Sequence, residues 1–199
     1  SRGLHGGRAA TLAAHKPMPP QISIAAEFAR LGITATAESD RGGWRIDSKA
    51  NAAFAVCSTY PPVLALPAAA TPELIAAVAQ YRKRGRIPVL TWRSTRGGGG
   101  VLIRCAQPGK GLLMRRSSAD EEYCALLRSA SGSQQLVLMD ARSVAAAHAN
   151  AFRGGGVERP ARYAVDGVEY CGLANVHVVR QVALALRASA RQGATPSPS

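Results

Sequence analysis

Apolar segments in this sequence are short, and each is interrupted by Gly, Pro or a charged residue. The longest candidate, from Val63 to Ala79, is cut by Pro67, Pro72 and Glu73. A helix that crosses a bilayer needs about 20 predominantly apolar residues in succession, so we expect no membrane span. Apolar residues make up 47% and charged residues 19% of the 199 residues, which is unlike a disordered acidic chain. We therefore expect one folded domain.

The short apolar runs alternate between two periodicities. Compact aliphatic runs between turn residues are typical of strands, and apolar residues three or four apart are typical of a helix face. Because aromatic residues make up only 5%, we expect a core of Leu, Val, Ile and Ala. Alternating strands and helices indicate an α/β fold. The expected helices begin near residues 22, 72, 118, 143 and 175, and the expected strands are Phe54–Cys57, Val63–Leu66, Ile87–Trp92, Val101–Arg104, Leu136–Asp140 and Val168–Leu173.

Two of the expected helices carry clear end signals. Thr71 is a good N-cap, Pro72 suits the first helical position, and Gly85 is expected to close that helix. Ser117 or Ser118 caps the next helix, whose first turn holds three acidic residues. Acidic side chains there are stabilised by the positive end of the helix dipole.

The cysteine pattern argues against disulfides and metal. Cys57, Cys105, Cys124 and Cys171 include no C-x-x-C pair, so we expect reduced thiols and neither a zinc site nor any other cofactor. Cys105 and Cys171 fall on strand-like segments, and we interpret them as buried small apolar residues.

The chain is strongly basic, with 25 Lys and Arg against 12 Asp and Glu and a net charge of +13. Such a balance favours anionic partners, which include nucleic acid, phospholipid headgroups and phosphorylated substrates. We expect a flexible basic lead-in at 1–21, a domain at 22–190 and a disordered tail at 191–199. The basic run Tyr81–Arg86 could bind an anion, but a solvated helix end is the simpler interpretation. Arg180 could attract a phosphate, but we expect it to form an ion pair with a nearby carboxylate.

Several peptide segments follow one another in an order that is not generic. They closely resemble the first half of the phosphatase domain of the myotubularin-related family, and the resemblance covers residues 27–187. Each fragment alone would be a weak signal, but together they are specific. The segments are Trp44–Ile46, Cys57–Pro61, Arg86–Trp92, Arg104–Pro108, Arg116–Tyr123, Asp140–Arg142, Ala149–Glu158 and Asn175–Arg180.

The resemblance implies a fold and a function. It implies a partial tyrosine-phosphatase-like α/β domain, with a central mixed sheet flanked by helices. The family comprises cysteine-dependent enzymes that remove the 3-phosphate from phosphatidylinositol 3-phosphate and phosphatidylinositol 3,5-bisphosphate. It further implies a cytoplasmic protein, peripheral on endosomal-type anionic membranes, that binds a phosphoinositide headgroup and forms homo- or hetero-oligomers with related myotubularins.

The catalytic loop of that family is not found in this sequence. Its chemistry needs a thiolate, with an Arg six positions later that grips the phosphate oxygens. The positions six residues after the four cysteines are Val63, Gly111, Ala130 and His177, and none is Arg. The family's loop would lie several tens of residues past Arg187. We therefore expect a chain truncated before the loop and inactive alone, with no catalytic residue to name.

Three positions match residues that contact the inositol headgroup in the family: Asn150, Asn175 and Val176. A carboxamide offers both a donor and an acceptor to ring hydroxyls and phosphate oxygens, and Asn175 would stand at a helix N-terminus, which favours anions. On the residues alone, Asn175 is an N-cap and Asn150 helps to end a helix. The resemblance favours headgroup contact for Asn175 and leaves both interpretations open for Asn150.

Three functional hypotheses follow. The first is a truncated phosphoinositide 3-phosphatase, and the second is a non-catalytic pseudophosphatase that serves as an adaptor or headgroup binder. The third, a basic nucleic-acid-binding module, rests on the charge of +13 alone. It lacks a recognisable motif and the aromatic platforms that stack on bases, so a nucleic-acid partner is the least favoured.

Overall fold

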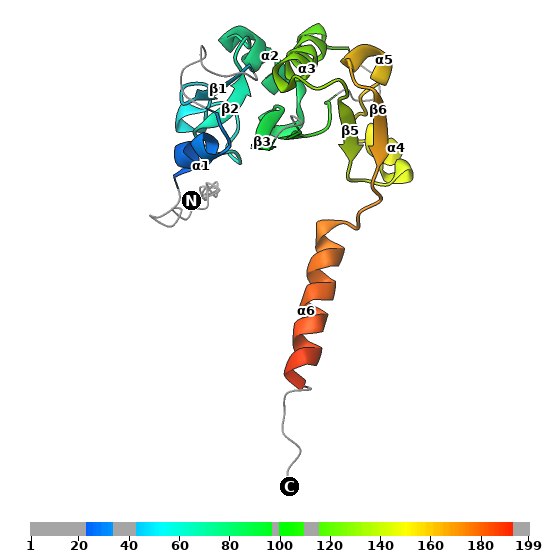
Figure 1. Cartoon of the computed structure of the whole chain (residues 1–199). Coiled ribbons are helices and arrows are strands. Elements are labelled where there is room, and N and C mark those ends of the chain that lie inside the picture. The colour runs from blue at the N-terminus through cyan, green and yellow to red at the C-terminus, as the bar shows by residue number, and fades with distance from the viewer. Residues whose placement is uncertain (1–22, 34–42, 97–99, 110–115, 193–199) are drawn as a thin grey trace, which may run out of the picture.

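The computed structural model describes residues 23–33, 43–96, 100–109 and 116–192 (Figure 1). The expected lead-in at 1–21 lies outside the described residues, as does the expected tail beyond residue 192. The strands are β1 (Trp44–Asp47), β2 (Leu64–Pro67), β3 (Val89–Arg93), β4 (Val101–Arg104), β5 (Val137–Asp140) and β6 (Gly167–Tyr170). The helices are α1 (Ile24–Arg30), α2 (Pro72–Tyr81), α3 (Ser118–Ser131), α4 (Val144–Ala151), α5 (Pro160–Tyr163) and α6 (Val176–Gln192), with short 3-10 turns at Ala52–Phe54 and Lys83–Gly85.

The strands pair two by two. β1 pairs with β2 and β3 with β4, both antiparallel, whereas β5 and β6 are parallel. The parallel pair needs a crossover, which α4 and α5 supply. A mixture of strands and helices is thus confirmed. We expected one central mixed sheet, but the described strands form three separate pairs. The register of β3 against β4 shifts between Leu90 and Trp92, as at a β-bulge.

The helix ends follow the expected chemistry. The Thr71 hydroxyl accepts a hydrogen bond from the Leu74 amide at 3.2 Å at the start of α2. Of the two candidate serines, Ser117 caps α3, since its hydroxyl accepts from the Asp120 amide at 3.2 Å. These side chains satisfy amides that the first helical turn leaves without backbone partners.

Two expected elements differ in the structure. Phe54–Cys57 is not a strand, because its first amides bond within a 3-10 turn and the buried Asn51 carboxamide bonds the Val56 and Cys57 amides and the Cys57 carbonyl. The Asn51 Nδ2 donates to the Pro61 carbonyl at 2.8 Å and its Oδ1 accepts from the Cys57 amide at 2.8 Å. Gly85 does not close α2, which ends at Tyr81; Gly85 instead ends the following 3-10 turn.

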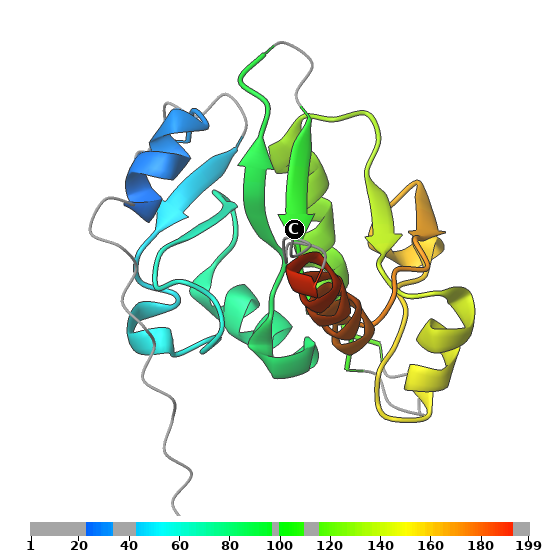
Figure 2. The same cartoon turned by 90° about the horizontal axis from the view of Figure 1, so that it is seen from below.

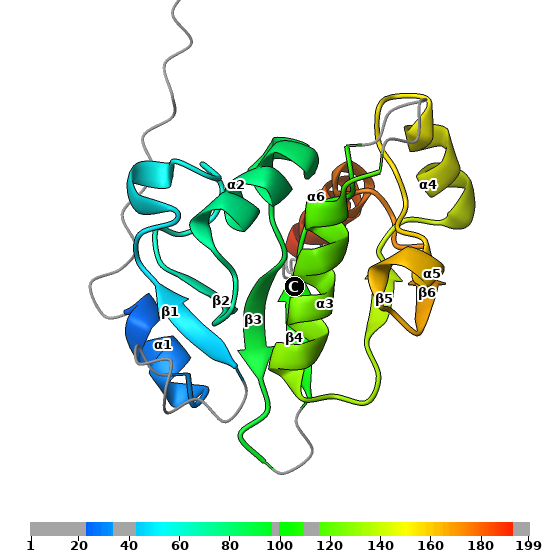
Figure 3. The same cartoon turned by 90° about the horizontal axis from the view of Figure 1, so that it is seen from above.

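One buried cluster joins β1, β2, α2, β3 and α3. Aliphatic residues dominate it as expected, but its largest fully buried side chains are aromatic: Trp44, Tyr123 and Tyr163. The Tyr123 hydroxyl donates to the Pro88 carbonyl at 3.0 Å, so its polar end is satisfied inside the core. Figure 3 shows α2 and α3 above the strands, and Figure 2 shows the opposite face of β3 and β4 from below. α6 projects away from this body (Figure 1).

Two glycines provide a matched test of the close contact between Gly85 and the backbone of Val56. Gly85 has φ +65°, and a Cβ placed there would lie 2.1 Å from the Val56 carbonyl oxygen. Gly132, which ends α3, has φ +62° with open space around it. Gly132→Ala should cost about 1–2 kcal/mol for the left-handed backbone alone, and Gly85→Ala should cost clearly more because the backbone must also move. Urea unfolding of both variants measures this, and equal costs would contradict the packing described.

Candidate functional site

Asn150, which the resemblance matches to a headgroup contact, lies in the last turn of α4 and is half-buried. Its carbonyl accepts hydrogen bonds from the Arg153 amide at 3.0 Å and the Gly155 amide at 2.9 Å. Gly154, between them, has φ +82°, a conformation that turns the chain out of the helix. The backbone of Asn150 therefore helps to end α4, and no hydrogen bond joins its carboxamide to a described residue.

Asn175 and Val176 stand at the start of α6. The Asn175 Oδ1 accepts from the His177 amide at 3.0 Å, and its carbonyl accepts from the Val179 amide at 3.1 Å. This is the geometry of an N-cap, and Val176 is 72% exposed. Among the described residues, no hydrogen bond joins this helix start to Asn150. The structure shows the capping role of Asn175 and leaves headgroup contact as a proposal.

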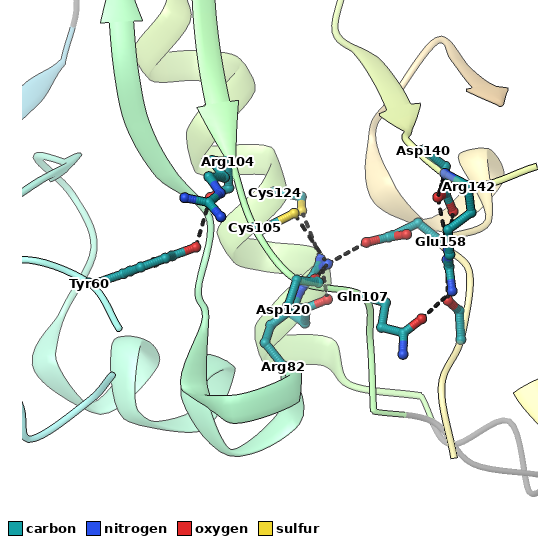
Figure 4. A network of polar contacts seen from close by, with 12 residues as sticks. Tyr60, Arg82, Arg104, Cys105, Gln107, Asp120, Cys124, Asp140, Arg142 and Glu158 are labelled. Carbon is teal, nitrogen blue, oxygen red and sulfur yellow. Dashed lines mark hydrogen bonds and ion pairs between the residues drawn. The ribbon is translucent and has the colours of Figure 1, made fainter. Parts of the chain in front are cut away.

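The most heavily buried charges of the described residues meet at Arg82, which follows α2 directly (Figure 4). Its guanidinium donates to both Asp120 oxygens, at 2.7 and 2.8 Å, and also to Glu158. A further donor reaches the Ala106 carbonyl at 2.9 Å, and the Tyr163 ring centroid lies 5.9 Å away. Burial acts to lower the pKa of Arg82, but the facing anionic groups outweigh it and raise that pKa, so the guanidinium stays charged.

A second charged cluster lies at the end of β5. Arg142 donates to Asp140 at 2.6 Å, to Gln107 and to the Gly156 carbonyl at 3.2 Å (Figure 4). Burial alone would raise the pKa of Asp140, but the hydrogen bonds from Arg142 outweigh it and hold that pKa below its ordinary value. The charges of the Asp140–Arg142 segment are therefore engaged in holding the end of β5 and the loop around Gly156.

The two clusters hold the segment that follows Asn150 at two points. Glu158 is tied to Arg82, and the Gly156 carbonyl is tied to Arg142. Gly155 directly precedes the first of these anchors along the chain and lies so close to Gln107 that a Cβ would be 2.6 Å from its Nε2. The chain from Asn150 to Glu158 is therefore positioned by charges that come from α2, α3 and β5.

The thiols near Arg82 are not activated. Cys105 and Cys124 place their sulfurs 3.7 and 3.9 Å from the guanidinium. Burial raises the pKa of the Cys105 thiol to about 11 and that of the Cys124 thiol to about 12, although Arg82 opposes the shift. Both are therefore protonated at neutral pH and are poor nucleophiles.

We expected Cys105 and Cys171 to be buried, and this is wrong, because both residues are exposed as a whole. Each directly follows a short strand instead of lying within it. In Cys105 the sulfur still faces Arg82 (Figure 4). Within the described ranges, no group of three or more His, Cys, Asp or Glu side chains is placed to hold a metal ion.

Our sequence interpretation missed Arg82. We expected the run Tyr81–Arg86 to be a solvated helix end, but Arg82 is only 2% exposed. Its neighbours Lys83 and Arg84 are exposed as expected. The nearest signal in the sequence is that Asp120 and Glu158 both fall inside the resembling segments, yet nothing local to Arg82 indicates its partners.

Replacing Arg82 by Met should lower the free energy of unfolding by about 3–5 kcal/mol, because two carboxylates would remain buried without their cation. Lys83→Met, on the exposed neighbour, should change it by less than about 0.5 kcal/mol. The triple variant Arg82→Met, Asp120→Leu, Glu158→Leu should recover part of the loss, since no unpaired charge remains. Urea unfolding of all three variants tests this, and a tolerated single replacement would refute it.

Asp140 should make the stability of the domain sensitive to acid. Because its folded pKa is lowered from 3.8, its contribution is fully present above pH 4 and is lost as pH falls through that value and below. The melting temperature of the wild type should therefore fall more steeply below pH 4 than that of Asp140→Asn. Parallel melting curves across pH 2–6 compare the two. Identical slopes would show that Asp140 is not held by Arg142 in solution.

Known proteins match most of this chain. The myotubularin-like phosphatase domain, as a family profile, matches residues 12–197. Phosphatidylinositol-3,5-bisphosphate 3-phosphatase MTMR2 of Gallus gallus is 37% identical over 156 residues, which cover 78% of this chain and 26% of that protein. Myotubularin of Xenopus tropicalis is 35% identical over 156 residues, with 78% and 25% covered.

A third relative gives the same result. Phosphatidylinositol-3,5-bisphosphate 3-phosphatase MTMR3 of Caenorhabditis elegans is 38% identical over 140 residues, which cover 67% of this chain and 14% of that protein. The chain spans about a quarter of the length of the chicken and frog relatives. The family profile covers the whole region, residues 27–187, that carries the resemblance in the sequence. This chain belongs to the myotubularin-like phosphatase domain family.

Proposed function

We propose that this chain is the headgroup-binding part of a myotubularin-type phosphoinositide 3-phosphatase, and that it does not hydrolyse phosphate by itself. The observation that carries the proposal is the family match over residues 12–197, together with relatives that are named as phosphatidylinositol-3,5-bisphosphate 3-phosphatases. In the same proposal, the three strand pairs are part of a larger tyrosine-phosphatase-like domain with a central mixed sheet.

The chemistry of the thiols supports the lack of hydrolysis. A cysteine-dependent phosphatase needs a thiolate below a loop of backbone amides and an Arg that grips the phosphate. None of the four cysteines of this chain has an Arg six positions later. The two thiols at Arg82 are held protonated by burial, and that guanidinium is committed to Asp120 and Glu158.

Binding of the headgroup is assigned to Asn150, Asn175 and Val176. Asn175 begins a helix of 17 residues, whose N-terminal amides and dipole favour an anion. Glu169 is the last acidic residue, so the chain from Tyr170 to Ser199 offers no carboxylate to repel a phosphate. The Asn150 carboxamide is available to a second part of the headgroup.

A non-catalytic adaptor of the same family is the alternative, and the same thiol chemistry favours it. A nucleic-acid-binding module rests on the charge of +13 alone. In either family role we place the protein in the cytoplasm, peripheral on endosomal-type anionic membranes, in homo- or hetero-oligomers with related myotubularins. Within the described residues, no helix has the length and apolar content that crossing a bilayer requires.

Headgroup binding is tested by sedimentation with vesicles that contain phosphatidylinositol 3-phosphate. Asn175→Asp keeps an equally good N-cap but places a carboxylate where the phosphate would lie, so we expect binding to weaken about tenfold or more. Gln181→Asp has the same charge change and lies in the same helix beyond its first turn, so it should lose much less. Circular dichroism confirms that the helix is retained in both variants.

The outcomes separate the hypotheses. Equal binding by both variants would refute the role of Asn175, and stronger binding to single-stranded RNA than to vesicles would favour the nucleic-acid module. Release of phosphate from a soluble phosphatidylinositol 3-phosphate by the purified chain would refute the lack of hydrolysis. Its absence, with headgroup binding retained, is the expected result.

A further inference from the structure

An open hollow lies between the end of helix α1 and the end of strand β3. Its volume is about 340 Å³, and small-molecule sites in proteins measure roughly 300–1,000 Å³. Arg30 and Leu31 line it from α1, and residues 92–96 line it from β3 and the chain directly after β3. Leu31 is buried, whereas Trp92 is 44% exposed. The hollow therefore has the size of a ligand site and walls from two separate elements.

Three arginines line this hollow, and none of the described residues that line it is acidic. Arg30 and Arg96 are exposed, and Arg93 is half-buried. A guanidinium presents five N–H donors in a planar fork, which fits two oxygens of a phosphate at once. Because three positive charges around one space repel one another, an anion that enters the hollow relieves the repulsion. The hollow is therefore built to attract an anion.

Hydrogen bonds hold the two walls of the hollow in place. A guanidinium nitrogen of Arg93 donates to the Gly32 carbonyl at 3.5 Å, which links the end of β3 to the chain after α1. The Ser94 amide donates to the Gly100 carbonyl at 2.8 Å, and the Ser94 hydroxyl donates to the Arg96 carbonyl at 3.1 Å. Because the backbone that carries the arginines is already bonded, less freedom is lost when a ligand binds.

The end of α1 does not need these arginines. The amides of residues 31–33 donate to carbonyls within α1, so the last turn is closed by backbone bonds. Arg30 pairs with Glu27 at 2.9 Å, but both side chains are exposed, and such pairs add little stability. No described residue bonds the guanidinium of Arg96. A purely structural role therefore leaves the gathering of three cations unexplained.

The hollow is separate from the residues assigned to the headgroup. The Ala106 carbonyl, two residues beyond β4, bonds Arg82, so the Arg82 cluster lies at the end of the hairpin where β4 finishes. Arg93 pairs with Val101 at the other end, roughly 13 Å along the strands. Figure 3 shows α1 and this end of β3 on the opposite side of the molecule from α4, which carries Asn150.

Positive charge alone does not mark a site on this chain. Arg180, for which we expected an ion pair, is exposed and pairs with no carboxylate of a described residue. It stands on a helix whose residues 176–191 are all exposed, so no described wall surrounds it. At the hollow, by contrast, the cations come from two segments that a hydrogen bond joins across 61 residues of sequence.

We propose that this hollow is a second anion site, which binds the phosphate monoester group of a phosphorylated ligand. The phosphate lies among the three guanidiniums, and the Thr95 hydroxyl is a further donor to its oxygens. The part of the ligand next to the phosphate lies against the exposed side of Trp92. A soluble phosphorylated metabolite and a lipid headgroup both supply this chemistry. The site does not depend on the headgroup residues of the proposed function.

Trp92 provides the measurement, because the chain has two tryptophans and the other, Trp44, is fully buried. Titration of the whole chain with phenyl phosphate should change the tryptophan fluorescence until it saturates, whereas benzyl alcohol, which has the ring without the phosphate, should not. The second arm uses vesicles that contain phosphatidylinositol 3-phosphate. Tighter binding of phenyl phosphate, compared per phosphate, assigns the site to a soluble ligand, and tighter binding of the vesicles assigns it to a headgroup.

The double variant Arg93→Gln, Arg96→Gln removes two of the three cations and should weaken phenyl phosphate binding at least tenfold. The matched control is Lys83→Gln, Arg84→Gln, which removes the same charge from exposed residues that precede β3 at its other end. It should change the affinity less than twofold. Circular dichroism compares the folding of both variants, and Arg96→Gln alone, at an exposed residue, repeats the test with a smaller change.

A third variant should act in the opposite direction. Glu27→Gln removes the carboxylate that holds Arg30, so it should tighten phenyl phosphate binding about threefold. A fluorescence change that does not saturate, or an equal loss of affinity in the two double variants, would overturn the proposal. Because Trp92 reports the hollow and Asn175→Asp tests the headgroup residues, failure of one site is distinguishable from failure of the other.

Discussion

The buried ion pairs of Arg82 are the constraint on which the arrangement of this chain depends. They join α2 to Asp120, 38 residues away, and to Glu158, 76 residues away. Removing a guanidinium and two carboxylates from water costs several kcal/mol per ion, and only a close, fully bonded geometry offsets that cost. Alternative packings of α2, α3 and the segment after α4 would leave one of these charges unpaired. We infer that Arg82 selects one arrangement more than it adds net stability.

The second charged cluster extends this constraint to the start of α6. The backbone of 140–142 accepts hydrogen bonds from the amides of Cys171, Gly172 and Leu173, at 2.8, 3.3 and 2.8 Å. The cluster at Asp140 also holds the Gly156 carbonyl through Arg142. The segment that follows Asn150 and the segment that precedes Asn175 therefore depend on the same few polar groups. These groups place Asn175 although residues 176–191 of α6 are exposed among the described residues.

Local chemistry could be predicted from the sequence, and long-range pairing could not. Thr71 and Ser117 cap their helices because the capping bond involves residues three positions away. Phe54–Cys57 has the composition of a strand, but the Asn51 carboxamide captures its backbone. Arg82 lies in a run of cations that looks solvated, and its partners are 38 and 76 residues distant. The N-cap role of Asn175 can be predicted from its residue type and position, whereas its headgroup role is implied by the family resemblance alone.

The buried charged groups and the exposed apolar groups of this chain differ in whether they have partners. The buried charges of Arg82, Asp120 and Glu158 find their partners within this chain, whereas the apolar side chains of α6, Leu102 and Met139 remain exposed. Burying a charge without a partner costs much free energy, so a buried charge needs its counter-charge within the same folded region. Exposing apolar surface costs less free energy, and burying that surface later favours association. A region built in this way folds around its ion pairs and presents a surface that a further layer can cover.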